Sequence, residues 1–203
     1  MERVDRRPPQ LFATADSAPL FSGSWWPDTV GAAVRHAASS CGREMTACYL
    51  GASNGDAPEF YDMFVFAAGR LGFDENRCQH VAVGCGEEEM RCVAEQAALV
   101  LLSGGDTAAG WAAYTHSGLD IALRAAHHGG AVLVGISAGA IHLGSHGYRS
   151  CGAGETVPYQ TLGLVHQLFG TPYEGTLSLY YSPFCFLPVP CGIPDKRGGA
   201  AGL

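Results

Sequence analysis

Short apolar runs alternate along the chain with segments whose apolar residues recur at helical spacing. The apolar runs have the length of buried strands and cover residues 10–15, 45–50, 80–83, 98–102 and 131–136. The other segments indicate helices, which begin at 28, run from 56 or 58 to about 71, and cover 87–96 and 107–128. Strands that alternate with helices form parallel sheets, because only helices can cover both faces. The pattern predicts an α/β fold, a three-layer sandwich around a mostly parallel central sheet.

The alternation fades after residue 147. The ranges 161–165 and 176–181 still have the character of strands. The ends, 1–9 and 195–203, are expected to be loose. The chain has 203 residues, without an internal repeat or a linker that would separate two units. We therefore expect a single domain that spans 1–203.

The charge balance excludes several classes of partner. Nineteen acids face twelve bases, which gives a net charge of -7, so a nucleic-acid partner is not expected. The chain has no apolar run of about 18 residues that would predict a membrane span, and the first residues lack the apolar stretch of an export signal.

The eight cysteines show no paired or zinc-binding spacing, which indicates reduced thiols in a cytoplasmic protein. We expect no metal and no cofactor.

The segment 131–144 carries the strongest chemical signal. A buried strand leads into Gly135-Ile136-Ser137-Ala138-Gly139, and a helix is predicted to follow. In the G-x-S-x-G motif, the glycines allow a sharp turn that raises the serine hydroxyl above the sheet edge. The turn also points the N–H groups of the following helix toward an oxyanion beside the serine. Ser137 is thus a candidate nucleophile; the alternative is a tight turn with an incidental serine.

A second glycine loop follows the strand at 98–102. Ser103-Gly104-Gly105-Asp106 should lie at the same carboxyl edge of the sheet, where α/β proteins bind ligands. An N–H group of Gly104 or Gly105 could complete an oxyanion hole with Ala138. Asp106 either contributes to the site or caps the next helix. A phosphate-binding loop fits less well, because no Walker lysine follows.

The two motifs together resemble a known family. LLSGGDT (101–107) and VGISAGAI (134–141) look like peptidase family S51, the aspartyl dipeptidase and cyanophycinase group, whose fold is similar to class I glutamine amidotransferases. The resemblance implies that Ser137 is the nucleophile and that Gly105 and Ala138 form the oxyanion hole. It also suggests a small peptide substrate, with an N-terminal aspartate or aspartyl-arginine units, and a monomer or homodimer. We place Gly104, Asp106 and Tyr173 among the substrate-binding residues.

The general base is harder to assign from the sequence. Tyr173 stands where the family's histidine is expected, and its ordinary pKa of about 10 makes it a poor base. His166 is the candidate replacement, and His142 is more consistent with packing. Asp195, in Gly-Ile-Pro-Asp, resembles the family's orienting acid; the alternative is a solvated acid in a tail. The chain is also expected to be short at its C-terminus.

These residues predict a serine peptidase that works through an acyl-enzyme. The alternative is a catalytically impaired S51-like protein that keeps the pocket for binding or regulation. Because tyrosine replaces the expected histidine, we expect hydrolysis of aspartyl dipeptides to be slow or absent, and Tyr173→His should raise it if Asp195 is in place. An esterase of the α/β-hydrolase type fits poorly, because no histidine lies beyond His166.

Overall fold

The computed structural model describes residues 10–15, 28–152 and 155–165, and its centre is a five-stranded parallel sheet. The strand order is β1-β5-β4-β2-β3. The strands are β1 (Leu11–Thr14), β2 (Glu44–Leu50), β3 (Cys78–His80), β4 (Ala97–Leu102) and β5 (Val132–Ile136). Every pairing in this sheet is parallel. The carboxyl ends of all five strands therefore meet at one edge.

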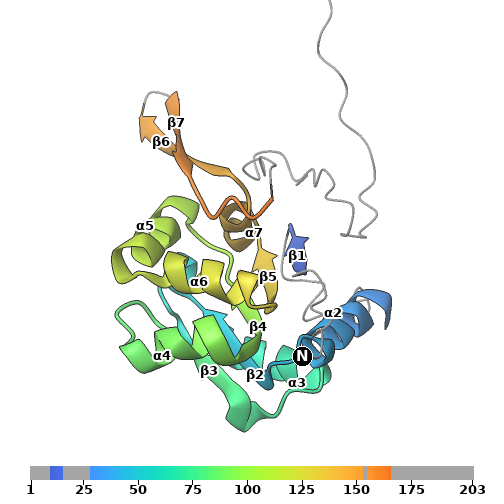
Figure 1. The fold of residues 1–203 in the computed structure, drawn as a ribbon. Coiled ribbons are helices and arrows are strands. Elements are labelled where there is room, and N and C mark those ends of the chain that lie inside the picture. Colours follow the sequence, from blue (N-terminus) through green and yellow to red (C-terminus); the bar gives the residue numbers. More distant parts are fainter. Residues whose placement is uncertain (1–9, 16–27, 153–154, 166–203) are drawn as a thin grey trace, which may run out of the picture.

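Helices cover both faces of the sheet (Figure 1). One face packs against α2 (Asp28–Ser40) and α3 (Pro58–Arg70). The other packs mainly against α5 (Thr107–Ser117), α6 (Leu119–His128) and the π-helical turn η3 (Cys92–Gln96). Shorter helical elements are η1 (Ala52–Asn54), η2 (Glu75–Arg77), α4 (Glu87–Arg91) and α7 (Ala138–Leu143). The predicted three-layer α/β class is confirmed.

The central strands are apolar at every position because both of their faces are buried. All residues of β4 and β5 are buried. Leu99 and Leu101 face the side of α2 and α3, whereas Val100 and Leu102 face the side of α5 and α6. This explains why these strands lack the alternation of a half-exposed sheet.

The single helix predicted over 107–128 is wrong. Gly118 adopts φ 80°, which ends α5 and begins α6. A left-handed residue of this kind interrupts a helix, and glycine takes that conformation without a steric penalty. The apolar pattern continues across Gly118 because both helices pack on the same face of the sheet.

The region after α7 also differs from the prediction. An antiparallel hairpin, β6 (His146–Gly152) and β7 (Glu155–Gln160), extends beyond the end of α7 (Figure 1). Residues of β7 are mostly exposed, so the hairpin has little of the buried alternation that reveals a strand. The range 161–165 is not a strand, because its backbone bonds back to residues 142–145 instead of joining a sheet. The predicted strand at 80–83 lies earlier, at β3, and the range 176–181 lies outside the described residues.

One further property concerns the length of the helices. None of the helices in the described ranges is long and apolar enough to cross a membrane.

Candidate active site

Loops at the ends of β2, β4 and β5 are joined to one another by backbone hydrogen bonds. The Asp106 N–H donates to the Ser53 carbonyl at 2.7 Å, which joins the glycine loop to η1. The Gly139 N–H donates to the Ser103 carbonyl at 3.0 Å, which joins α7 to the end of β4. These bonds hold both predicted motifs at one edge of the sheet. The sequence argument from parallel strand ends predicted this proximity.

Ser137 lies on a strained turn between β5 and α7. Its φ of 49° and ψ of -107° are unusual for a residue other than glycine. The Ser137 N–H donates to the Thr14 carbonyl at 2.8 Å, and its own carbonyl accepts the Ile141 N–H at 3.1 Å. Backbone strain of this kind costs about 1–3 kcal/mol and is concentrated at functional sites. The side chain is only half-buried, so substrate can reach it.

The two glycines of the motif are required by close packing behind Ser137. A Cβ atom on Gly135 would lie 2.6 Å from the Gly139 carbonyl carbon. A Cβ atom on Gly139 would lie 2.2 Å from the Leu102 carbonyl oxygen. Both distances are far shorter than van der Waals contact. The motif thus allows α7 to pack directly on β4 and β5 and fixes the direction in which Ser137 leaves the strand.

The second glycine loop lies beside the serine. A Cβ atom on Gly104 would be 3.4 Å from the Ser137 Cβ, so the two loops lie next to each other. Gly105 has φ 136°, and a Cβ there would lie 2.0 Å from the Ser53 carbonyl oxygen. Glycine is therefore the residue that fits at 105, where the loop crosses η1.

Two backbone N–H groups at this edge are suited to bind an oxyanion. Within the part of the chain that the structure describes, neither Gly105 nor Ala138 donates its N–H to a backbone carbonyl. Ala138 is the first residue of α7, where helix N–H groups have no partner inside the helix. Gly105 is exposed. Their oxyanion role stays a prediction, and the geometry leaves both groups available for it.

Asp106 acts as a helix cap. Its Oδ1 accepts the Ala109 N–H at 2.8 Å at the start of α5. The capping alternative from the sequence is therefore confirmed, while a contact between Asp106 and substrate stays a prediction.

Tyr159, from the hairpin, was not identified from the sequence. Burial, and secondarily the negative charge of Asp106, raises the pKa of Tyr159 to about 12, so this phenol stays protonated.

His142 is excluded as the base for Ser137. Its ring is fully buried against Trp111 and Tyr114, and its Nε2 bonds to the Thr107 carbonyl at 2.8 Å. Because a carbonyl only accepts, Nε2 carries the proton. Burial lowers the pKa of His142 to about 4 despite this hydrogen bond. It is a packed histidine, as the sequence suggested, and it connects α7 to the first residue of α5.

The remaining parts of the predicted triad lie outside the described residues. These are His166, Tyr173 and Asp195. Among the residues that are described, none forms a hydrogen bond with the Ser137 hydroxyl. The described part of the site therefore consists of Ser137, the candidate nucleophile, and the glycine loop beside it.

Sequence reasoning missed the contribution of the loop after β2. Ser53 lies directly beneath Gly105, and the Asn54 amide donates to the Tyr49 hydroxyl at 2.7 Å. This loop follows a buried parallel strand, and that position in the sequence was the signal that could have placed the loop in the site. Arg124 of α6 donates to the carbonyls of Thr161 and Leu162. It holds the backbone beyond the hairpin.

Comparison with known proteins identifies the family. Residues 53–174 match peptidase family S51, so the chain belongs to this family, and the resemblance noted in the sequence is confirmed. No curated protein matches the sequence.

Two solved structures have a similar fold. One is a peptidase from an acI-B1 actinobacterium, with 17% identity and a TM-score of 0.60 over 78% of this chain and 66% of the other. The second is a putative peptidase E protein from Listeria monocytogenes EGD-e, with 16% identity and a TM-score of 0.55 over 79% of this chain and 77% of the other. The chain thus spans slightly less than two thirds of the first structure.

Proposed function

We propose that the protein is a serine peptidase that hydrolyses a small peptide or isopeptide bond through an acyl-enzyme. One observation carries the proposal. Ser137 occupies a strained turn at φ 49° at the end of a central buried strand, with Gly104 beside it. Strain at this position is explained if the turn must present the hydroxyl. Family membership supports the peptidase class.

The reaction follows from the groups around Ser137. Its Oγ attacks the scissile carbonyl while a base takes the hydroxyl proton. The negative oxygen that forms is stabilised by the N–H groups of Gly105 and Ala138. The base then returns the proton to the leaving amine, and water hydrolyses the acyl-enzyme in the same manner.

The role of base is assigned to His166 by elimination together with the sequence. Seven of the eight histidines are described, and none of them bonds to Ser137. His142 is buried and bonded elsewhere. His80 is the last residue of the edge strand β3, and its Nε2 lies 3.4 Å from Asp56 Oδ1. His166 is therefore the favoured base, with Asp195 as the acid that orients it.

Aspartyl peptides are the substrates to test first. The resemblance to aspartyl dipeptidases and cyanophycinases favours peptides with an N-terminal aspartate or aspartyl-arginine units. The purified chain should hydrolyse at least one of these faster than a matched leucyl dipeptide. The comparison tests the substrate class separately from the nucleophile, because each peptide meets the same Ser137.

The kinetic test compares three variants. Ser137→Ala should lower kcat/KM by at least about three orders of magnitude, because no other group provides the nucleophile. His166→Ala should have a similar effect on kcat. Ser117→Ala is the control, because its hydroxyl bonds to the Ala113 carbonyl near the end of α5. Full activity of Ser137→Ala would overturn the proposal.

A further inference from the structure

Two thiols face each other in the core on the side of α5 and α6. Cys48 lies in β2, and Cys92 is the first residue of η3. Their sulfur atoms are 3.8 Å apart, although the residues are 44 positions apart in the sequence. Cys48 is 0% exposed and Cys92 is 2% exposed, and both are free thiols.

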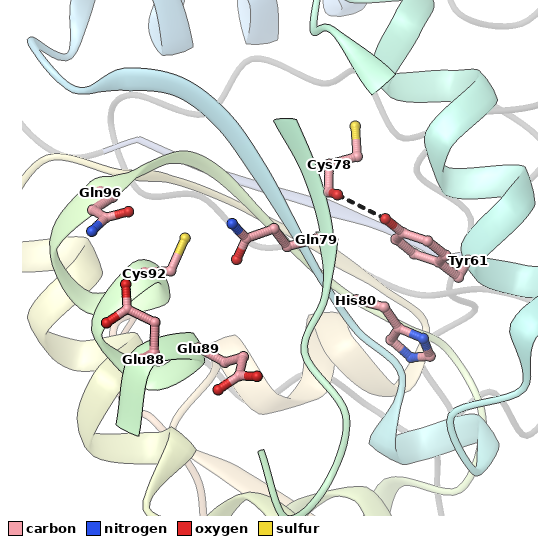
Figure 2. Close-up of a pocket in the computed structure, with 8 residues that line it drawn as sticks. All are labelled: Tyr61, Cys78, Gln79, His80, Glu88, Glu89, Cys92 and Gln96. Carbon is pink, nitrogen blue, oxygen red and sulfur yellow. Dashed lines mark hydrogen bonds between the residues drawn. The ribbon is translucent and has the colours of Figure 1, made fainter. Parts of the chain in front are cut away.

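Cys92 lines a pocket at the surface of the described residues. An open pocket of about 400 Å³ lies between β3 and α4, and Cys92 forms part of its wall. Figure 2 shows the side chains of Gln79, Glu88 and Gln96 around Cys92. Cys48 is not among the lining residues. A small solute can thus approach Cys92 from this pocket, while Cys48 lies behind it.

We propose that Cys48 and Cys92 form a redox modification site at which a hydroperoxide converts the two thiols to a disulfide. The pocket admits the peroxide to Cys92, and the 3.8 Å separation places Cys48 ready to react with the product. The inference concerns Cys48 of β2 and Cys92 of η3, which are not part of the site around Ser137, and does not depend on the proposed peptidase activity.

The two steps balance in atoms and electrons. The Cys92 thiolate attacks one oxygen of hydrogen peroxide, so an S–O bond forms, the O–O bond breaks and hydroxide leaves with the proton that Cys92 gave up. The Cys48 sulfur then attacks the Cys92 sulfenic acid, so the S–S bond forms and the S–O bond breaks. The second hydroxyl leaves as water with the proton of Cys48. Two electrons from the thiols reduce one peroxide to two waters.

The electrostatics assign different roles to the two thiols. The hydrogen bond between them raises the pKa of Cys48, with burial adding to the effect, and lowers the pKa of Cys92. Arg91 also favours the Cys92 thiolate, whereas burial and Glu88 oppose it. The thiolate is the reactive form, so Cys92 attacks peroxide first. Cys48 keeps its proton until the second step.

Closing the bond requires a small local movement. A disulfide holds its sulfurs about 2.05 Å apart, so the pair must approach by slightly less than 2 Å. η3 is a π-helical turn, a geometry that is often found at functional positions. Arg43 holds its far end by donating to the carbonyls of Ala94 and Ala97 at 2.9 Å and 3.2 Å. The movement that brings the two sulfur atoms together must therefore come from the Cys92 end of η3.

Peptide mapping of the wild-type chain tests the proposal directly. The reduced full-length protein is treated with a small excess of hydrogen peroxide, blocked with N-ethylmaleimide, and digested without reduction. Mass spectrometry should find one peptide pair joined between Cys48 and Cys92, with two thiols lost per chain. A phosphine reductant should restore both thiols. Free Cys48 and Cys92 after this treatment would overturn the proposal.

Variants separate the two roles. In Cys48→Ala, dimedone should trap a sulfenic acid on Cys92; in Cys92→Ala, Cys48 should stay unmodified. Cys78→Ala is the control, because Cys78 packs on the other face of the sheet and burial raises its pKa to about 11. The control should form the same Cys48–Cys92 link as the wild type. Dimedone on another cysteine instead of Cys92 would contradict the assignment.

Discussion

Gly139→Ala tests whether packing behind Ser137 positions the nucleophile. The added Cβ would lie 2.2 Å from the Leu102 carbonyl oxygen and 2.7 Å from its carbonyl carbon. To reach even a tight contact of 3.4 Å, α7 and β4 must separate by about 1.2 Å. The neighbouring atoms are backbone of a fully buried strand, so no side chain can rotate away.

The expected cost has a thermodynamic and a kinetic part. Overpacking of this kind destabilises by about 1–3 kcal/mol. For a chain of this length that lowers Tm by about 2–12 °C. Because the same shift moves Ser137 relative to Gly104, kcat should fall by about 100-fold, the typical effect of a 1 Å misplacement. Urea unfolding followed by circular dichroism measures the first effect, and peptide hydrolysis well below Tm measures the second.

Gly69→Ala is the matched control. Gly69 is exposed near the end of α3, and a Cβ there would meet nothing within 4 Å. Alanine should stabilise this helix by about 0.5–1 kcal/mol and leave kcat unchanged. Equal stability of Gly139→Ala and the wild type would refute the packing argument, as would an equal loss in both variants.

Three further predictions follow from single residues. Asp106→Ala should lower the unfolding free energy by about 1 kcal/mol in a urea titration, while Asp106→Asn keeps the cap and most of the stability. The folded-state pKa of His142, about 4, lies below the unfolded value of about 6.5, so the unfolded chain binds more protons between these values. Stability should be full above about pH 6.5 and decrease by up to about 3 kcal/mol as the pH falls toward 4; His142→Gln should flatten this dependence. If His166 is the base, His166→Ala should lower kcat by three or more orders of magnitude and Tyr173→His should give no gain; a gain from Tyr173→His with no loss from His166→Ala would favour the impaired homologue.

The central sheet could be predicted from the sequence because its strands are short, apolar and separated by helical segments. β4 and β5 have no polar residue within the run, and each is followed by glycine and serine at the same sheet edge. Both candidate loops were therefore found from strand ends together with the G-x-S-x-G and Gly-Gly patterns that follow them. Parallel topology then determines which edge they share.

The errors arise where local pattern and tertiary contacts disagree. Gly118 divides a helix whose apolar pattern is continuous on both sides, and that break depends on a backbone angle. The hairpin of β6 and β7 carries exposed side chains, so it lacks the periodicity of a buried strand. The role of Ser53 depends on a backbone carbonyl, which its side-chain type does not reveal.

The most direct test of the central claim is the position at which a serine-directed fluorophosphonate attaches to the native protein. Such a probe reacts with an activated serine hydroxyl, and an oxyanion hole accelerates the reaction. Mass spectrometry should find a single adduct on the peptide that contains Ser137, and no adduct in Ser137→Ala. An adduct on a different serine, or an unlabelled protein that still hydrolyses peptides, would contradict the assignment of Ser137 as the nucleophile.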